Sequence, residues 1–179
     1  ASVAAGSVIR GGLGFLGAAP EAGIVMVKLR QAKQYLRDFY LVSDQAVAFA
    51  ESDILLALRY MEIYAISRAR PMVICVGLGT NMGDHAGHSV LADYLRQIAT
   101  KRSRAVIVCG GNEGNSAHHY MGTSMEGLRE TIDNVEIRVG ENTRGFVAEL
   151  WGDIPAQHAI SIRTPGGEIT PIVDFREQN

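Results

Sequence analysis

Short apolar runs alternate with amphipathic stretches along the first part of the chain. The runs Ile24–Leu29, Met72–Val76 and Ala105–Cys109 each have the length and composition of a buried strand. Two stretches between them, beginning at Glu51 and at Ser89, carry apolar residues every three or four positions, which is typical of amphipathic helices. The order strand, helix, strand, helix, strand predicts a parallel sheet with right-handed crossovers, and therefore an α/β fold.

The two predicted helices have recognisable ends and faces. Pro71 stops the first because its ring cannot continue a helix, and Ser89 is placed to cap the amino end of the second. We expect both helices to pack on the sheet through their apolar positions. These are Ile54, Leu55, Leu58, Met61 and Ala65 in the first helix and Leu91, Leu95 and Ile98 in the second.

The pattern changes after about Asn115, where apolar and polar residues alternate with a period of two. Such alternation predicts half-buried antiparallel strands at Val135–Val139, Phe146–Leu150 and Ile160–Ile162. Turn residues separate these runs at Gly140–Thr143, Gly152–Pro155 and Pro165–Gly167. The sequence therefore predicts an α/β unit over residues 1–120 and a β-rich segment over residues 121–179.

The composition of the chain argues against several classes of function. Apolar residues make up 47% of the chain and charged residues 20%, which is ordinary for a globular protein. The net charge of −2 gives no basic field for nucleic acid, and no apolar run is long enough to span a membrane. The spacing of the two cysteines, Cys75 and Cys109, fits no zinc site. We expect two buried free thiols, with a disulfide between them as the alternative.

Two features of the chain concern its extent and its surface. Ala1–Arg10 has no charged n-region, so we expect no signal peptide in this sequence. The chain begins mid-pattern without a methionine, so we expect a processed or excised piece of a longer protein. The polar stretch Gln31–Gln45 lies between a predicted strand and a predicted helix. We interpret it as a surface loop, with a substrate- or partner-facing loop as the alternative.

The strongest chemical motif is Val108–Asn115, in which a buried strand runs into two glycines and an exposed amide. Ligand sites in open parallel sheets lie at the carboxyl ends of strands, which is where Asn112 falls. A carboxamide at that position can donate a hydrogen bond to a developing oxyanion. Taken alone, the same residues also fit an ordinary turn.

The order of the other pieces gives this motif a context. The segments Ala1–Gly6, Leu16–Ala22 (L-G-A-A-P-E-A) and Val76–Gly79 (V-G-L-G) precede G-N-E-G, with strands and helices between them. In this order they resemble landmarks of the subtilisin-like serine proteases: the helix after the catalytic histidine, the G-x-A-P-x-A turn, and the S-x-G wall of the S1 pocket. The resemblance covers residues 1 to about 115.

The resemblance extends to the clostridial branch of that family, whose members carry a jelly-roll insertion after the oxyanion asparagine. Val135–Asp174 is similar to part of such an insertion, above all at Glu149–Asp153. The resemblance thus implies that residues 1–120 are part of a catalytic domain with a subtilisin-like parallel sheet flanked by helices. Residues 121–179 would be the jelly-roll-like insertion.

Carried over by position, the resemblance implies a set of site residues. Asn112 matches the oxyanion-hole asparagine of the family. The two walls of the S1 pocket match Gly77, Leu78 and Gly79 on one side and Cys109, Gly110 and Gly111 on the other. Gly77 replaces the usual serine and Cys109 the commoner alanine, so the pocket differs in shape from the family's usual one.

The resemblance also implies that the Asp/His/Ser triad lies outside this chain. The aspartate and histidine motifs belong upstream of Ala1, and the serine motif belongs well downstream of Asn112. Gly122–Met125 (G-T-S-M) copies the start of the serine motif, but Ser124 lies only 12 positions after Asn112 and A-x-P does not follow. We interpret this match as a coincidence.

Other interpretations remain. Gly12–Gly17 fits G-x-G-x-x-G, yet a dinucleotide-binding motif follows a strand and opens a helix, and this one precedes Ala18-Ala19-Pro20. A second alternative is a catalytically dead pseudoprotease that acts as a binding or sensor protein. His85 and His88 share a short loop that fits either solvated histidines or a metal site.

The resemblance has further implications. It implies a peptide or protein substrate, the remaining segments of the same protease as partners, and an extracellular or spore-associated location. It requires no cofactor. Subtilases often bind structural calcium, but no cluster of carboxylates in this sequence identifies such a site.

Overall fold

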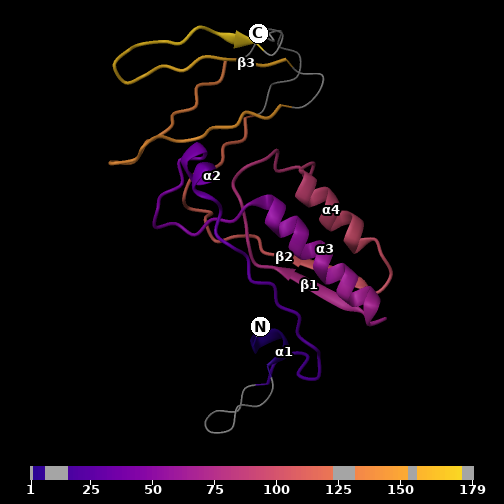
Figure 1. The fold of residues 1–179 in the computed structure, drawn as a ribbon. Helices are drawn as coiled ribbons and strands as arrows, with labels where there is room; N and C mark the ends of the chain where they lie inside the picture. The colour runs from indigo at the N-terminus through magenta and orange to yellow at the C-terminus, as the bar shows by residue number, and fades with distance from the viewer. Residues whose placement is uncertain (1, 7–15, 123–131, 153–156, 175–179) are drawn as a thin grey trace.

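The computed structural model describes residues 2–6, 16–122, 132–152 and 157–174 (Figure 1). These residues form a mixture of helix and strand that is compatible with an α/β fold. None of the helices in the described residues has the length and apolarity that crossing a membrane requires. The helices are α1 (Ser2–Ala5), α2 (Gln34–Phe39), α3 (Glu51–Ser67) and α4 (Val90–Ala99), and the strands are β1 (Met72–Val76), β2 (Arg104–Val108), β3 (Ala159–Ile160) and β4 (Val173–Asp174).

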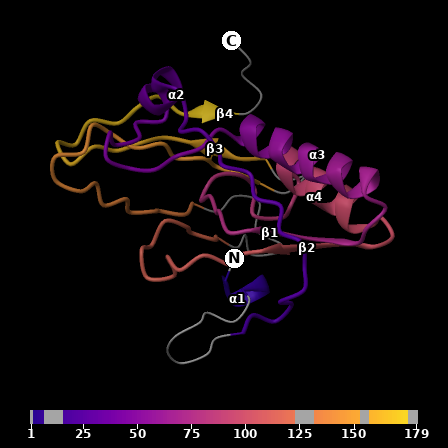
Figure 2. The same ribbon diagram turned by 60° about the horizontal axis from the view of Figure 1, so that its bottom comes forward.

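Strands β1 and β2 form a parallel pair, as the sequence predicts. Their register runs from Met72 opposite Arg104 to Val76 opposite Val108. The pairing continues one residue further, because the backbone N–H of Cys109 donates to the carbonyl of Val76 at 3.2 Å. Helix α4 makes the crossover between the strands, and α3 and α4 lie on the same side of the sheet (Figures 1 and 2).

A small core lies between the two helices and the sheet. Leu58 of α3, Ile74 of β1 and Ile98 of α4 are 2%, 2% and 0% exposed. The predicted helix faces are confirmed, since Ile54, Met61, Leu91 and Leu95 pack against this cluster. The predicted cap is also confirmed, because Ser89 Oγ accepts a hydrogen bond from the Ala92 N–H at 3.1 Å.

The opposite face of the sheet is uncovered by the described residues. Alternate side chains of a strand point to opposite faces, so Val73 and Ile107 point away from α3 and α4 and are 65% and 58% exposed. Cys75 shares this face, and Cys109 follows the end of β2. Both thiols are free and exposed. The prediction of buried thiols is therefore wrong, because nothing described covers the face on which the strand places Cys75.

The segment Ile24–Leu29 is not a strand, which corrects the prediction of a third parallel neighbour. It has no regular secondary structure, with Val25 and Val27 partly buried and Ile24 and Met26 exposed. A strand needs a hydrogen-bonded partner, and no described strand pairs with this segment.

The polar stretch Gln31–Gln45 contains a short helix, α2, instead of only a loop. Its centre is Arg37, which is only 5% exposed. The Arg37 guanidinium donates to Gln31 Oε1 at 2.8 Å and to the carbonyls of Ser43 and Ala46 at 2.6 and 3.0 Å. A buried cation with three acceptors holds the insert in one conformation.

The β-rich segment contains less strand than the sequence predicts. Strands β3 and β4 pair in antiparallel fashion. Between them, an isolated antiparallel β-bridge joins Arg163 to Ile169. The predicted turn after Thr164 is present, since its carbonyl accepts from the Gly167 N–H at 3.0 Å. A jelly roll is not formed by these described strands.

Two predicted strands of this segment, Val135–Val139 and Phe146–Leu150, have no regular secondary structure and belong to no described sheet. Ile137 and Phe146 are 53% and 49% exposed. The alternation shows that one face of each segment would be more apolar than the other. A strand also requires hydrogen-bonded partner strands, which the described residues do not supply. The turn between them is confirmed by the bond from Thr143 Oγ1 to the Gly140 carbonyl at 2.8 Å.

Candidate functional site

The site predicted from the sequence lies at the carboxyl edge of the parallel pair. Because β1 and β2 run in the same direction in register, residues 77–79 and 109–112 leave the sheet at the same edge. All seven of these residues are exposed, and the Leu78 side chain is 38% exposed. The structure thus places the predicted S1 walls and Asn112 on neighbouring segments, and their roles stay predictions.

Backbone geometry explains why one position of the motif, residue 111, is a glycine. Gly111 has a φ of 76°, in the left-handed region that side chains rarely adopt, so it supplies the bend directly before Asn112. At Gly77, Gly79 and Gly110 an added Cβ would meet nothing within 4 Å. These three positions therefore border open space, which fits an edge to which another backbone can come close.

A polar network joins the two loops that leave this edge. Asn81 Nδ2 donates to Glu113 Oε2 at 2.8 Å, and His118 Nδ1 lies 3.1 Å from Asn81 Nδ2 and 3.3 Å from Glu113 Oε2. The bond from Asn81 and the contact with His118 hold the pKa of Glu113 below its ordinary value. The network fixes the loop after β1 against the loop after β2.

The sequence pattern does not predict this network. Glu113 stands inside the G-N-E-G motif, directly after Asn112, and Asn81 follows two residues after Gly79. The one available signal was that Glu113 carries a carboxylate directly beside Asn112, a residue with a predicted role. The partner was not readable, because 32 positions separate Asn81 from Glu113 along the chain.

The loop between β1 and α4 is also held internally. Asp84 accepts from the backbone N–H groups of Ala86 and His88 at 3.3 and 3.4 Å, and it pairs with the His88 ring. Partial desolvation raises the pKa of Asp84, but the bonds from His88 and Ala86 outweigh it and lower the pKa. Within the described residues, no group of three or more His, Cys, Asp or Glu side chains is placed to hold a metal ion.

A second histidine of that loop contacts the loop after β2. The rings of His85 and His119 have centroids 4.4 Å apart, and His85 Nε2 lies 3.2 Å from the Asn81 carbonyl. The adjacent histidines His118 and His119 thus contact different residues of the same opposing loop. Both contacts strengthen the connection between the two loops of the site.

The β-rich segment reaches the same loop through Glu149. Its carboxylate oxygen Oε2 accepts from the Gly83 N–H at 2.8 Å and from Trp151 Nε1 at 3.0 Å. The Gly83 bond, then the Trp151 bond, lower the pKa of Glu149 against a small opposing effect of burial. Glu149 is the first residue of the Glu149–Asp153 stretch, which resembles an insertion in the sequence. It therefore anchors the loop beside the predicted S1 wall.

The start of the chain packs against the predicted G-x-A-P turn. The N–H groups of Gly17, Ala18 and Ala19 donate to the carbonyls of Gly6, Val3 and Ala4 at 2.8, 3.0 and 2.7 Å. The turn itself is closed by the Ala22 N–H, which donates to the Ala19 carbonyl at 3.0 Å. The two first landmarks of the resemblance are therefore one hydrogen-bonded unit.

Three motifs noted in the sequence fall partly outside the described residues. Of Gly122–Met125 only Gly122 is described, so the Ser124 interpretation stays a prediction. Gly12–Phe15 and Asp153 also lie outside. The described residues after Gly17 contain no helix before α2 begins at Gln34, so the G-x-G-x-x-G match does not open a helix as a dinucleotide site would.

Comparisons with known proteins found little. No protein-family model matches the chain, and no curated protein matches it. One solved structure that matches is that of the CspB protease of Clostridium perfringens, with 28% sequence identity and a TM-score of 0.40. The match covers 44% of this chain and 17% of that one, so this chain spans only a small part of the length of its structural neighbour.

Proposed function

We propose that this chain is the central part of a subtilisin-like serine endopeptidase, for which it supplies the oxyanion-hole donor Asn112 and the walls of the S1 pocket. The observation that carries the proposal is the parallel, in-register pairing of β1 and β2. That pairing brings residues 77–79 and 109–112 to one sheet edge, as the order of the motifs requires.

The proposed reaction is hydrolysis of a peptide bond. A histidine in the complete protein takes the proton from a serine hydroxyl as the serine oxygen attacks the scissile carbonyl carbon. The carboxamide N–H of Asn112 and the backbone N–H of that serine stabilise the oxyanion of the tetrahedral intermediate. The histidine then passes the proton to the leaving amine, and water hydrolyses the acyl-enzyme by the same steps.

Substrate binding follows from the exposed edges of the two segments. The backbone groups of Gly77 and Gly79 pair with an extended substrate strand, as in β-strand addition. The substrate side chain enters between Leu78 on one side and residues 109–111 on the other. The bond between Asn81 and Glu113 keeps the two walls at a fixed separation, because it joins the loops that continue from them.

We further propose that residues 121–179 are an insertion of the jelly-roll type found in the clostridial branch. The described hairpin of β3 and β4 supports a β-rich character for this region. The Glu149 bond to Gly83 supports a role in holding the S1 side of the site. On this proposal the insertion is attached to the catalytic domain beside the pocket.

The proposal is tested in the complete protein that contains this segment, with a fluorophosphonate probe that reacts only with activated serines. We expect labelling of a single serine downstream of residue 179, and cleavage of a peptide substrate. The change Asn112→Ala should lower kcat by about 10²–10³, as loss of one oxyanion donor does, and leave labelling detectable. Asn115→Ala is the matched control, because Asn115 is an exposed amide three residues away and should have no such effect.

The alternative is a pseudoprotease, which predicts neither labelling nor cleavage by the complete protein. Intact-mass measurement of the 179-residue chain itself adds an independent check. We expect no mass shift with the probe, since the triad lies elsewhere. A stoichiometric adduct on Ser124 would show instead that Gly122–Met125 is the nucleophile motif.

A further inference from the structure

The amino edge of the parallel sheet, opposite to Asn112, carries a cluster of arginines. The turn between α3 and β1 and the turn between α4 and β2 lie side by side there, because the Met72 N–H donates to the Ser103 carbonyl at 3.0 Å. These two turns and the first residue of β2 supply the cationic side chains of Arg68, Arg70, Arg102 and Arg104.

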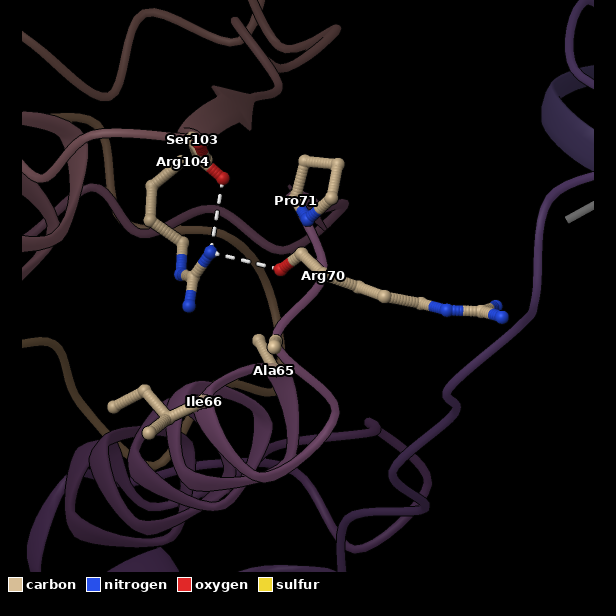
Figure 3. Close-up of a pocket in the computed structure, with 7 residues that line it drawn as sticks. Ala65, Ile66, Arg70, Pro71, Ser103 and Arg104 are labelled. Carbon is tan, nitrogen blue, oxygen red and sulfur yellow. Dashed lines mark hydrogen bonds between the residues drawn. The ribbon is translucent and has the colours of Figure 1, made fainter.

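The two turns border a shallow pocket of about 190 Å³ (Figure 3). Arg104 lies on its polar side, where Nη1 donates to the carbonyls of Arg70 and Ser103 at 3.1 and 2.9 Å. These bonds fix the guanidinium, and Figure 3 shows the rest of it extending toward the Ile66 side of the pocket. The apolar side consists of Ala65, Ile66, Ala69 and Pro71.

Most of this positive charge is not paired by the described residues. The nearby carboxylate of Glu62 accepts from Lys101 Nζ at 2.5 Å and from the Tyr94 hydroxyl at 3.0 Å. Within the described residues, no carboxylate forms an ion pair with any of the four arginines. In a chain whose net charge is −2, four arginines in two adjoining turns make a local concentration of positive charge.

A structural role accounts for part of the cluster. The arginines follow the carboxyl ends of α3 and α4, where cations interact favourably with the negative end of the helix macrodipole. That role needs neither a guanidinium fixed by two carbonyls nor an apolar pocket beside it. These two further features are those of a binding site for a group with a charged end and an apolar stem.

We propose that this edge binds an acidic peptide segment. One Asp or Glu carboxylate meets the Arg104 guanidinium while its methylene stem lies on the apolar side of the pocket. Flanking carboxylates then pair with Arg70 and Arg102, which are exposed on either turn. Guanidinium groups bind carboxylates through two parallel hydrogen bonds, which explains why arginines rather than lysines provide the free charge.

The surroundings favour a peptide over a nucleic acid. Binding of single strands usually combines a basic groove with aromatic rings on which bases stack. The aromatic ring next to this cluster, Tyr64, is covered by the Arg68 guanidinium, whose carbon lies 5.4 Å from the ring centroid. The cluster is also confined to two turns and forms no extended stripe.

Fluorescence anisotropy with a labelled glutamate-rich decapeptide tests the proposal on the 179-residue chain. We expect saturable binding that weakens as salt is raised, and no binding of the matched glutamine decapeptide. The double change Arg70→Glu and Arg102→Glu should weaken binding by roughly tenfold or more. Arg138→Glu with Arg144→Glu is the matched control, since it makes the same charge change at exposed positions of the β-rich segment and should alter binding less than twofold.

A conservative variant separates recognition by a guanidinium from charge alone. Arg104→Lys keeps the charge but loses the two-pronged geometry, so we expect weaker peptide binding with secondary structure retained by circular dichroism. Three results would overturn the proposal: no saturable peptide binding, equal loss of binding in the control pair, or tighter binding of single-stranded DNA or phosphatidylserine vesicles. If the native chain does not bind the peptide and the charge-reversal variant has a lower Tm, the arginines only stabilise the carboxyl ends of the helices.

Discussion

Asn81 and Glu113 are joined by a hydrogen bond of 2.8 Å between Nδ2 and Oε2, although 32 positions separate them. Asn81 follows β1 and Glu113 follows β2, so this bond crosses the edge at which the two parallel strands end. His118 joins the same pair from the loop after β2. The separation of residues 77–79 from residues 109–112 therefore depends on side chains that lie next to the proposed catalytic groups.

The Asn81–Glu113 bond should make the connection between the loops dependent on pH. The folded-state pKa of Glu113 is lowered from an ordinary value of 4.5, so its contribution to stability is fully present above about pH 4.5. It is lost as the pH falls through the lowered folded-state pKa. We expect the Tm difference between the native chain and Glu113→Gln to shrink below pH 4.5, measured by thermal melts across acid pH. A difference that stays constant down to pH 3 would contradict this account.

The carboxylate of Glu149 should order the loop around Gly83. In Glu149→Gln one oxygen remains but the charge is lost, and hydrogen bonds to a charged acceptor are the stronger ones. We expect faster amide hydrogen exchange at Gly83, measured by NMR, with little change in β1 or β2. Glu141→Gln is the control, because that exposed carboxylate lies in the turn at 140–143 and should leave Gly83 unaffected. Equal exchange at Gly83 in both variants would show that the loop holds its shape without Glu149.

The two faces of the sheet should respond very differently to the same substitution. Ile98 of α4 is 0% exposed in the core that it forms with Leu58 and Ile74, so Ile98→Ala should reduce the free energy of unfolding by about 2–5 kcal/mol. Ile107 is 58% exposed on the uncovered face, and Ile107→Ala should change it by no more than about 0.5 kcal/mol. Urea denaturation of both variants measures the contrast. A large loss for Ile107→Ala would mean that something packs on the face that the described residues leave open.

Both thiols should react in the native protein. Cys75 and Cys109 are exposed, so Ellman's reagent without denaturant should modify two thiols per chain. The single changes Cys75→Ser and Cys109→Ser should each leave one reactive thiol. If Cys75 reacts only after denaturant is added, the exposed face of the sheet must be covered in solution. Cys75 would then be buried, as its apolar strand sequence predicts.

Local sequence patterns determined much of the α/β unit. The three-to-four spacing of Leu58, Met61 and Ala65 and of Leu91, Leu95 and Ile98 fixed the faces of α3 and α4, because a helix with such a stripe must bury it. Ser89 identified the start of α4 through its side-chain oxygen. Two apolar runs separated by a helix were enough to predict the parallel pairing of β1 with β2, since that connection leaves few alternatives.

Only the tertiary structure decided which extended segments become strands and which side chains meet. Ile24–Leu29 is a short apolar run and Phe146–Leu150 alternates between apolar and polar residues. Both patterns favour a strand, but a strand requires a hydrogen-bonded partner that the sequence pattern does not name. The burial of Cys75 likewise depends on what covers a face. The contacts of Glu113 with Asn81 and of Glu149 with Gly83 join distant positions, so they exist only because the chain folds the loops of the site together.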